Sequence, residues 1–155
     1  NAPRLCRSLV MINSAAKFTV PPAILEALET DKQRAIELIT TYAFAPQLSP
    51  TWTEATRRLL SDVPLHTLRN DYLACRAFDA AERLHLVTVP TLIIGSAHDR
   101  LVPPDHARQA AAEIPNARLA VLERSGHMAV LTDTNDVRRI LDEFLLTGQN
   151  PAEGI

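Results

Sequence analysis

The stretch from Val89 to Met128 constrains the fold of this chain more than any other segment. Near its start, Thr91 to Ile94 form a short apolar run that is rich in β-branched residues. Pro90 precedes this run and Gly95 follows it. A pattern of this kind is typical of a strand that is buried on both faces of a sheet.

A helix and a second strand are expected later in the same stretch. Pro103 and Pro104 stand where a helix begins, since a proline in the first turn loses no hydrogen bond. The helix is expected from Asp105 to about Ile114, and the second buried strand from Leu119 to Leu122. A strand–helix–strand connection is right-handed and makes its two strands parallel. The sequence therefore predicts an α/β fold with a parallel sheet.

Asp99 and His127 each lie in a loop that follows one of these strands. The carboxyl ends of parallel strands share one edge of a sheet, and open α/β sheets place their sites at that edge. An imidazole is a common general base, and a carboxylate can fix its tautomer and stabilise the charge it acquires. We therefore expect the Asp99 carboxylate to lie about 2.6–3.2 Å from the His127 imidazole.

The remaining pattern predicts a third strand and a helical insertion. The unbroken apolar run from Ser8 to Ile12 indicates a buried strand. Four helices are expected after it, starting near Pro22, Asp31, Thr53 and His66, and a last helix from Asn135 to Leu146, with Thr134 as its cap. We expect residues 1–20 and 84–148 to form the core, residues 21–83 a helical cap, and residues 149–155 a polar tail.

Composition excludes several classes of function. The chain has 155 residues, 46% of them hydrophobic and 22% charged, with a net charge of −2. These values indicate a globular domain and predict neither a nucleic-acid partner nor an acidic membrane surface. No apolar run of about 18 residues predicts a membrane span, and the start does not resemble a signal segment. Cys6 and Cys75 are expected to be free thiols in a reducing, cytoplasmic compartment.

The other histidines do not predict a metal site. His66, His85, His98 and His106 follow no ligand spacing such as H-E-x-x-H. We expect His98 and His106 to be exposed, and we expect no metal ion or cofactor.

Several segments together resemble the C-terminal half of an α/β-hydrolase. The resemblance is carried by VPTLII, HDRLVPP, IPNARLAVL and the pair Gly126-His127, and it extends back to SLVMINSAA and forward to the helix that ends in EFL. It implies that Asp99 is the acid and His127 the base of a catalytic triad. It also implies that the inserted helices form a cap, like the mobile cap that many of these hydrolases place over the active site.

The nucleophile of such a triad has no counterpart in this sequence. The family order is nucleophile, acid, base, and its nucleophile sits in a G-x-S-x-G turn. No G-x-S-x-G occurs in the chain, so the resemblance places the nucleophile upstream of Leu5. Ser14 is interpreted as a turn residue, because nothing around it predicts a strained strand-to-helix turn.

The resemblance leaves several functions open. A serine hydrolase that cleaves a carboxylic ester, a lactone or a related acyl bond is the preferred hypothesis. Epoxide hydrolases, haloalkane dehalogenases, C–C bond hydrolases and haloperoxidases share the same frame. A non-catalytic fragment or interaction module is the alternative of another class. The apolar strand Ser8 to Ile12 would offer an open edge for an N-terminal half of the same fold or for a second copy.

Overall fold

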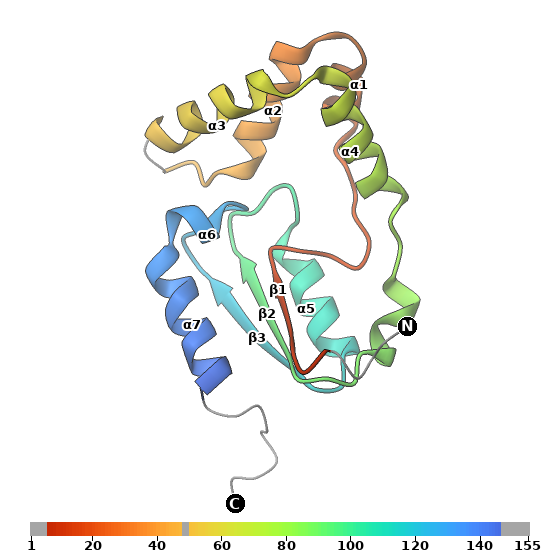
Figure 1. The fold of residues 1–155 in the computed structure, drawn as a ribbon, viewed down its shortest axis with the longest axis vertical. Coiled ribbons are helices and arrows are strands. Elements are labelled where there is room, and N and C mark those ends of the chain that lie inside the picture. Colours follow the sequence, from red (N-terminus) through yellow and green to blue (C-terminus); the bar gives the residue numbers. More distant parts are fainter. Residues whose placement is uncertain (1–5, 48–49, 147–155) are drawn as a thin grey trace, which may run out of the picture.

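A three-stranded parallel sheet forms the base of the molecule in a computed structural model that describes residues 6–47 and 50–146 (Figure 1). Its strands are β1 (Leu9–Ile12), β2 (Thr91–Ser96) and β3 (Ala117–Leu122), in the spatial order β1-β2-β3. Both pairings are parallel. The predicted sheet is therefore confirmed, although β2 ends later and β3 begins earlier than the sequence indicated.

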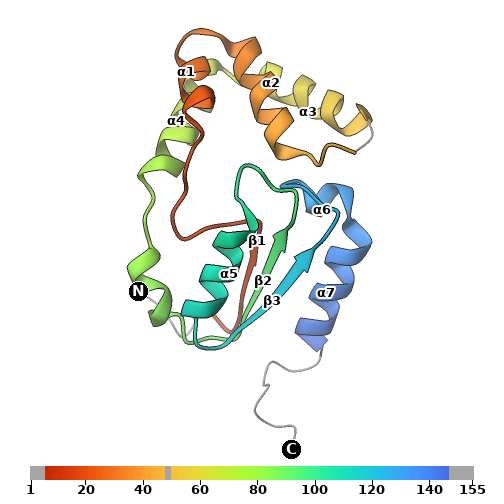
Figure 2. The same cartoon turned by 180° about the vertical axis from the view of Figure 1, so that it is seen from behind.

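Helices cover both faces of this sheet. Helix α5 (Pro104–Glu113) lies on one face and α7 (Thr134–Leu146) on the other, with the short α6 (Ala129–Thr132) between β3 and α7 (Figures 1 and 2). Side chains alternate between the faces of a strand. Leu92 and Ile94 accordingly pack in the cluster on the α7 side, and Ile93 packs in the cluster on the α5 side.

Four helices form the segment between β1 and β2, as predicted. They are α1 (Pro22–Thr30), α2 (Lys32–Ala43), α3 (Pro50–Asp62) and α4 (Leu65–Ala77), and the 3-10 helix η2 (Ala81–Leu86) follows them. The Asp31 carboxylate caps α2 by accepting a hydrogen bond from the backbone N–H of Arg34, at 2.9 Å. The four helices lie beyond the carboxyl ends of the strands (Figure 1).

These helices have an apolar cluster of their own. Its buried members come from α1, α2 and α4, namely Ile24, Ala27, Leu28, Ala35, Ile36, Ile39 and Leu68. The sheet contributes to two other clusters. The first cluster therefore lies mainly within the inserted helices. That these helices form a cap, and the boundaries of that cap, remain predictions.

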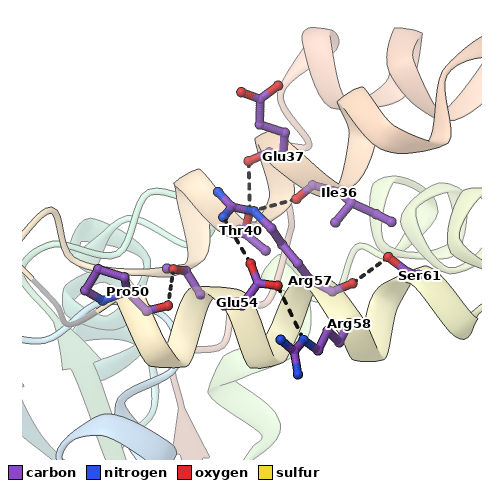
Figure 3. A network of polar contacts seen from close by, with 9 residues as sticks. Ile36, Glu37, Thr40, Pro50, Glu54, Arg57, Arg58 and Ser61 are labelled. Atoms are coloured by element: carbon purple, nitrogen blue, oxygen red, sulfur yellow. Dashed lines mark hydrogen bonds and ion pairs between the residues drawn. The ribbon is translucent and has the colours of Figure 1, made fainter.

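Two predicted helix caps are wrong. Thr53 lies inside α3, which begins at Pro50 (Figure 3). Its hydroxyl donates to the Pro50 carbonyl at 2.8 Å. Thr134 is the first residue of α7, and its hydroxyl donates back to the Val130 carbonyl at 3.0 Å. A capping residue stands before the first helical residue and its oxygen accepts from an N–H of the first turn. Thr53 and Thr134 instead lie within their helices, and each hydroxyl donates to a carbonyl earlier in the chain.

The two chain segments that join the four helices to the sheet run side by side. Lys17 and Asp79 form an antiparallel bridge and an ion pair of 2.7 Å, and the Ala80 N–H donates to the Ala16 carbonyl at 2.7 Å. The hydrogen bond from Lys17, followed by that from the Ala81 N–H, lowers the pKa of Asp79. This contact fixes where the chain leaves and re-enters the core.

Two further predictions concern the ends of the chain and the membrane. The predicted tail, residues 149–155, lies outside the described residues. Within residues 6–47 and 50–146, no helix is long and apolar enough to cross a membrane.

Candidate active site

Asp99 and His127 meet at the carboxyl edge of the sheet. Asp99 lies in the loop after β2, and His127 lies in the loop after the neighbouring strand β3. His127 Nδ1 is 2.8 Å from Asp99 Oδ2, so the predicted hydrogen bond is present. The parallel pairing of β2 with β3 explains how residues 28 positions apart become neighbours.

The Asp99 carboxylate is held by its own loop. Its other oxygen, Oδ1, accepts hydrogen bonds from the backbone N–H groups of Leu101 and Val102, at 2.9 and 2.8 Å. Asp99 is 3% exposed. A buried carboxylate needs such partners, because an unpaired charge in the interior is costly. The carboxylate therefore presents Oδ2 to the imidazole in a fixed orientation.

The imidazole of His127 has one nitrogen engaged and one available. Nδ1 faces Asp99, and the side chain is 28% exposed. In the part of the chain that the structure describes, no hydrogen bond reaches Nε2. An imidazole that donates Nδ1–H to a carboxylate carries its lone pair on Nε2. The pair can therefore accept a proton at Nε2 from a group placed beside it.

The end of helix α2 supports both loops. The Met128 N–H donates to the Ala43 carbonyl at 3.3 Å, next to His127. On the other loop, the Arg100 guanidinium donates to the Thr41 carbonyl and lies 5.1 Å from the centre of the Tyr42 ring. The last turn of α2 therefore contacts the residue that follows each member of the pair.

Asn13 is a site residue that the sequence patterns did not identify. It follows β1, is 6% exposed, and its side-chain amide donates to the Gly126 and His127 carbonyls at 3.2 and 2.8 Å. Its place directly after an apolar strand, at the edge that carries Asp99, was a usable signal. Asn13, Asp99 and His127 thus come from the segments that follow the three strands.

Three further polar residues, Ser96, His98 and His106, take no part in the contact between Asp99 and His127. Ser96 is fully buried at the end of β2, and its hydroxyl has no partner within the described residues. His98 is exposed, as predicted, but His106 is half-buried, because it lies with Lys17 and Leu84 around a small hollow beside η2. Among the described residues, no three His, Cys, Asp or Glu side chains are grouped to hold a metal ion.

Fold and site together define a member of the α/β-hydrolases, and comparison with known proteins agrees. Residues 66–155 match the α/β-hydrolase family model described as TAP-like protein. The chain belongs to this family.

Individual relatives carry hydrolase names. The chain is 31% identical over 160 residues to a protein from Pseudomonas savastanoi pv. phaseolicola named as a carbamate hydrolase, RutD, with 92% of the chain and 60% of RutD covered. A solved thermophilic esterase is 30% identical, with a TM-score of 0.86, 94% of this chain and 58% of that chain covered. The enol-lactonase from Burkholderia xenovorans LB400, at 18% identity and a TM-score of 0.82, shares the fold over 90% of this chain and 56% of its own.

The chain spans 60% of the length of the first curated relatives that it matches. Together, the family match and these relatives place the chain in the α/β-hydrolase superfamily.

Proposed function

We propose that this chain supplies the acid, Asp99, and the base, His127, of a serine hydrolase that cleaves a carboxylic ester, a lactone or a related acyl bond. The observation that carries the proposal is the 2.8 Å contact between His127 Nδ1 and Asp99 Oδ2 at the carboxyl edge of the sheet. The names of the esterase and of RutD support a choice of acyl substrates.

The proposed roles follow from the protonation of the imidazole. With Nδ1–H bonded to Asp99, Nε2 removes the proton from a serine hydroxyl as its oxygen attacks the acyl carbon. Asp99 then stabilises the imidazolium, and His127 gives the proton to the leaving oxygen or nitrogen as the acyl–enzyme forms. In the second half, Nε2 removes a proton from a water molecule as the water attacks the acyl carbon. His127 then returns this proton to the serine oxygen as the acyl–serine bond breaks and the acid leaves. No cofactor enters these steps.

The serine in this proposal comes from a segment with a G-x-S-x-G turn, which these 155 residues do not contain. In the described structure β1 pairs with β2 on one side only, and its other edge is available for a further parallel strand. A strand there would end at the same edge of the sheet as Asn13. We therefore propose that the nucleophile segment docks along β1.

The test joins this chain to the nucleophile-bearing part of a relative. The N-terminal part of RutD that lies outside the matched region would be fused in front of the chain, and hydrolysis of a p-nitrophenyl ester would be followed. We expect the fusion to react with a fluorophosphonate and to hydrolyse the ester. We expect His127→Ala and Asp99→Asn each to reduce hydrolysis at least about 1,000-fold.

Two controls give this experiment its meaning. His98→Ala removes an exposed histidine beside Asp99, and we expect the fusion to keep its activity. The 155-residue chain by itself should neither hydrolyse the ester above its own His127→Ala variant nor react with the fluorophosphonate. A folded, fluorophosphonate-labelled fusion whose hydrolysis survives His127→Ala would contradict the proposed base.

The lack of a G-x-S-x-G turn in these residues favours one second candidate, a non-catalytic module of the same fold. Under that candidate the Asp99–His127 bond would only hold two loops together. A folded fusion that binds the ester but does not turn it over would support it.

A further inference from the structure

We infer that Asn13 is a positioning residue for His127, and that it holds the backbone on both sides of the base. This inference rests on the proposed function, since it gives His127 the role of base. It assigns to the end of β1 a part in the site that neither the family match nor the names of the relatives describe.

The two acceptors of the Asn13 amide carry the inference. The Nδ2 group donates to the Gly126 carbonyl at 3.2 Å and to the His127 carbonyl at 2.8 Å. These carbonyls belong to the peptide groups that precede and follow the α-carbon of His127. One NH2 group has two hydrogens, so it can hold both. Fixing both peptide groups fixes the direction in which the His127 side chain leaves the backbone.

The orientation of the amide is determined by its surroundings. Both neighbours of Nδ2 are carbonyl oxygens, which only accept hydrogen bonds, so the NH2 end of Asn13 has to face them. In this orientation the amide oxygen, Oδ1, is buried and has no hydrogen-bond partner among the described residues. A buried polar atom without a partner is unfavourable. The bonds to the His127 loop are therefore kept at the expense of an unpaired oxygen.

The backbone of Asn13 explains why asparagine serves here. Asn13 has φ of 45°, the left-handed region, which asparagine adopts more easily than most residues. Its N–H donates to the Ile94 carbonyl of β2 at 2.8 Å, so the residue is anchored to the sheet. Glycine would allow this φ but carries no amide donor. Aspartate would fit the space but would direct an acceptor at two carbonyl oxygens. Asparagine meets both requirements.

The experiment measures the tautomer of His127 in Asn13 variants of the chain. The ¹⁵N shifts of the two ring nitrogens, read through the ring C–H groups in alkaline solution, give the ratio of Nδ1–H to Nε2–H imidazole. We expect Nδ1–H to dominate in the wild type. Asn13→Gly keeps the backbone but removes the amide, and we expect it to lower the ratio at least about three-fold, as the loss of a hydrogen-bonded restraint would. Asn13→Asp should lower it at least as far.

A matched variant and a stability measurement separate positioning from general support. Asn116 donates a similar amide bond, 2.9 Å long, to the Thr88 carbonyl at the opposite end of the strands. Asn116→Ala should leave the ratio of Nδ1–H to Nε2–H imidazole within about two-fold of the wild-type value. We expect this result even if Asn116→Ala and Asn13→Gly lower the midpoint of unfolding by the same amount.

The possible results are distinguishable. If the wild type lacks an Nδ1–H majority, the proposed pairing itself fails, and the inference fails with it. If the wild type has that majority and folded Asn13→Gly and Asn13→Asp retain the wild-type ratio, only the positioning role of Asn13 is overturned. An equal fall in the Asn13 and Asn116 variants would likewise overturn it, because that result indicates loss of structure in general.

Discussion

The backbone of Gly126 lies directly against the backbone of Ala45. A β-carbon placed on Gly126 would be 2.6 Å from the Ala45 nitrogen and 2.9 Å from the Ala43 oxygen. Such distances leave no room for a side chain, and the obstructing atoms are backbone. The loop that carries His127 and the segment after α2 are therefore packed as one unit.

Gly126→Ala should separate these two segments. We expect a loss of about 1–3 kcal/mol in the free energy of unfolding, the usual size for overpacking. We also expect faster hydrogen exchange at the Met128 amide, which donates to the Ala43 carbonyl. Urea denaturation and amide exchange measure the two effects.

Gly95→Ala is the matched control for that change. Its β-carbon would lie 2.9 Å from the β-carbon of Ala107, in the packing of α5 against the sheet. It should lower stability without selectively exposing the Met128 amide. If Gly126→Ala left both stability and Met128 exchange unchanged, the tight contact would be wrong.

The partial burial of Tyr72 in α4 predicts an alkaline transition. Tyr72 packs against the cluster formed by α1, α2 and α4, and burial, with a smaller effect of Cys75, raises its pKa to about 12 from 10.0. The folded pKa is the higher one, so the unfolded chain ionises first. The stability that depends on neutral Tyr72 is complete below pH 10 and is lost as the pH rises toward about 12.

Comparison with Tyr72→Phe isolates this contribution. The raised pKa corresponds to a loss of about 2–3 kcal/mol across that interval. Urea denaturation at several alkaline pH values measures this contribution. As the pH rises, the free energy of unfolding should fall by about 2–3 kcal/mol more in the wild type than in Tyr72→Phe. Parallel pH profiles for the two proteins would show that Tyr72 titrates normally in the folded state.

The open edge of β1 predicts self-association. Leu9 donates its N–H to the carbonyl of Pro90, just before β2, and Asn13 donates to Ile94 in β2. The alternate residues Val10 and Ile12 therefore direct their N–H groups away from β2. Among the described residues no strand pairs with this edge, and LVMI carries no proline or charge to protect it. We expect light scattering at tens of micromolar to show oligomers of the 155-residue chain.

Val10→Pro should reduce this association, because it removes an N–H from the open edge and spares the bonds to β2. Circular dichroism would confirm that the variant stays folded. A wild-type chain that is monodisperse and monomeric would mean that the edge does not recruit a second copy.

The sequence predicted the elements that depend on local signals. The β-branched run from Thr91 to Ile94, the prolines before α5 and the capping Asp31 each act on their neighbours, so their effects could be anticipated. The meeting of Asp99 and His127 was also predictable, because parallel strands bring their following loops to one edge.

Other features depend on contacts that no local pattern contains. Asn13 reaches carbonyls more than a hundred positions away, and Gly126 is required by the backbone near Ala45. The start of α3 at Pro50 was missed because Thr53 is a good cap by type, yet its hydroxyl bonds a carbonyl inside the helix. Residue type alone does not decide between these two uses of a threonine.

The most direct test of the Asp99–His127 pair is the tautomer of His127 in the wild type and in Asp99→Asn. The ring ¹⁵N shifts, measured in alkaline solution, should show mainly Nδ1–H imidazole in the wild type, which leaves Nε2 free to act as the base. In Asp99→Asn the ratio of Nδ1–H to Nε2–H should fall at least about ten-fold, because a neutral amide loses the charge-assisted bond and can offer an N–H in its place. A His127 with equal tautomers in the wild type, or one that Asp99→Asn leaves unchanged, would contradict the pair as the acid and base of this protein.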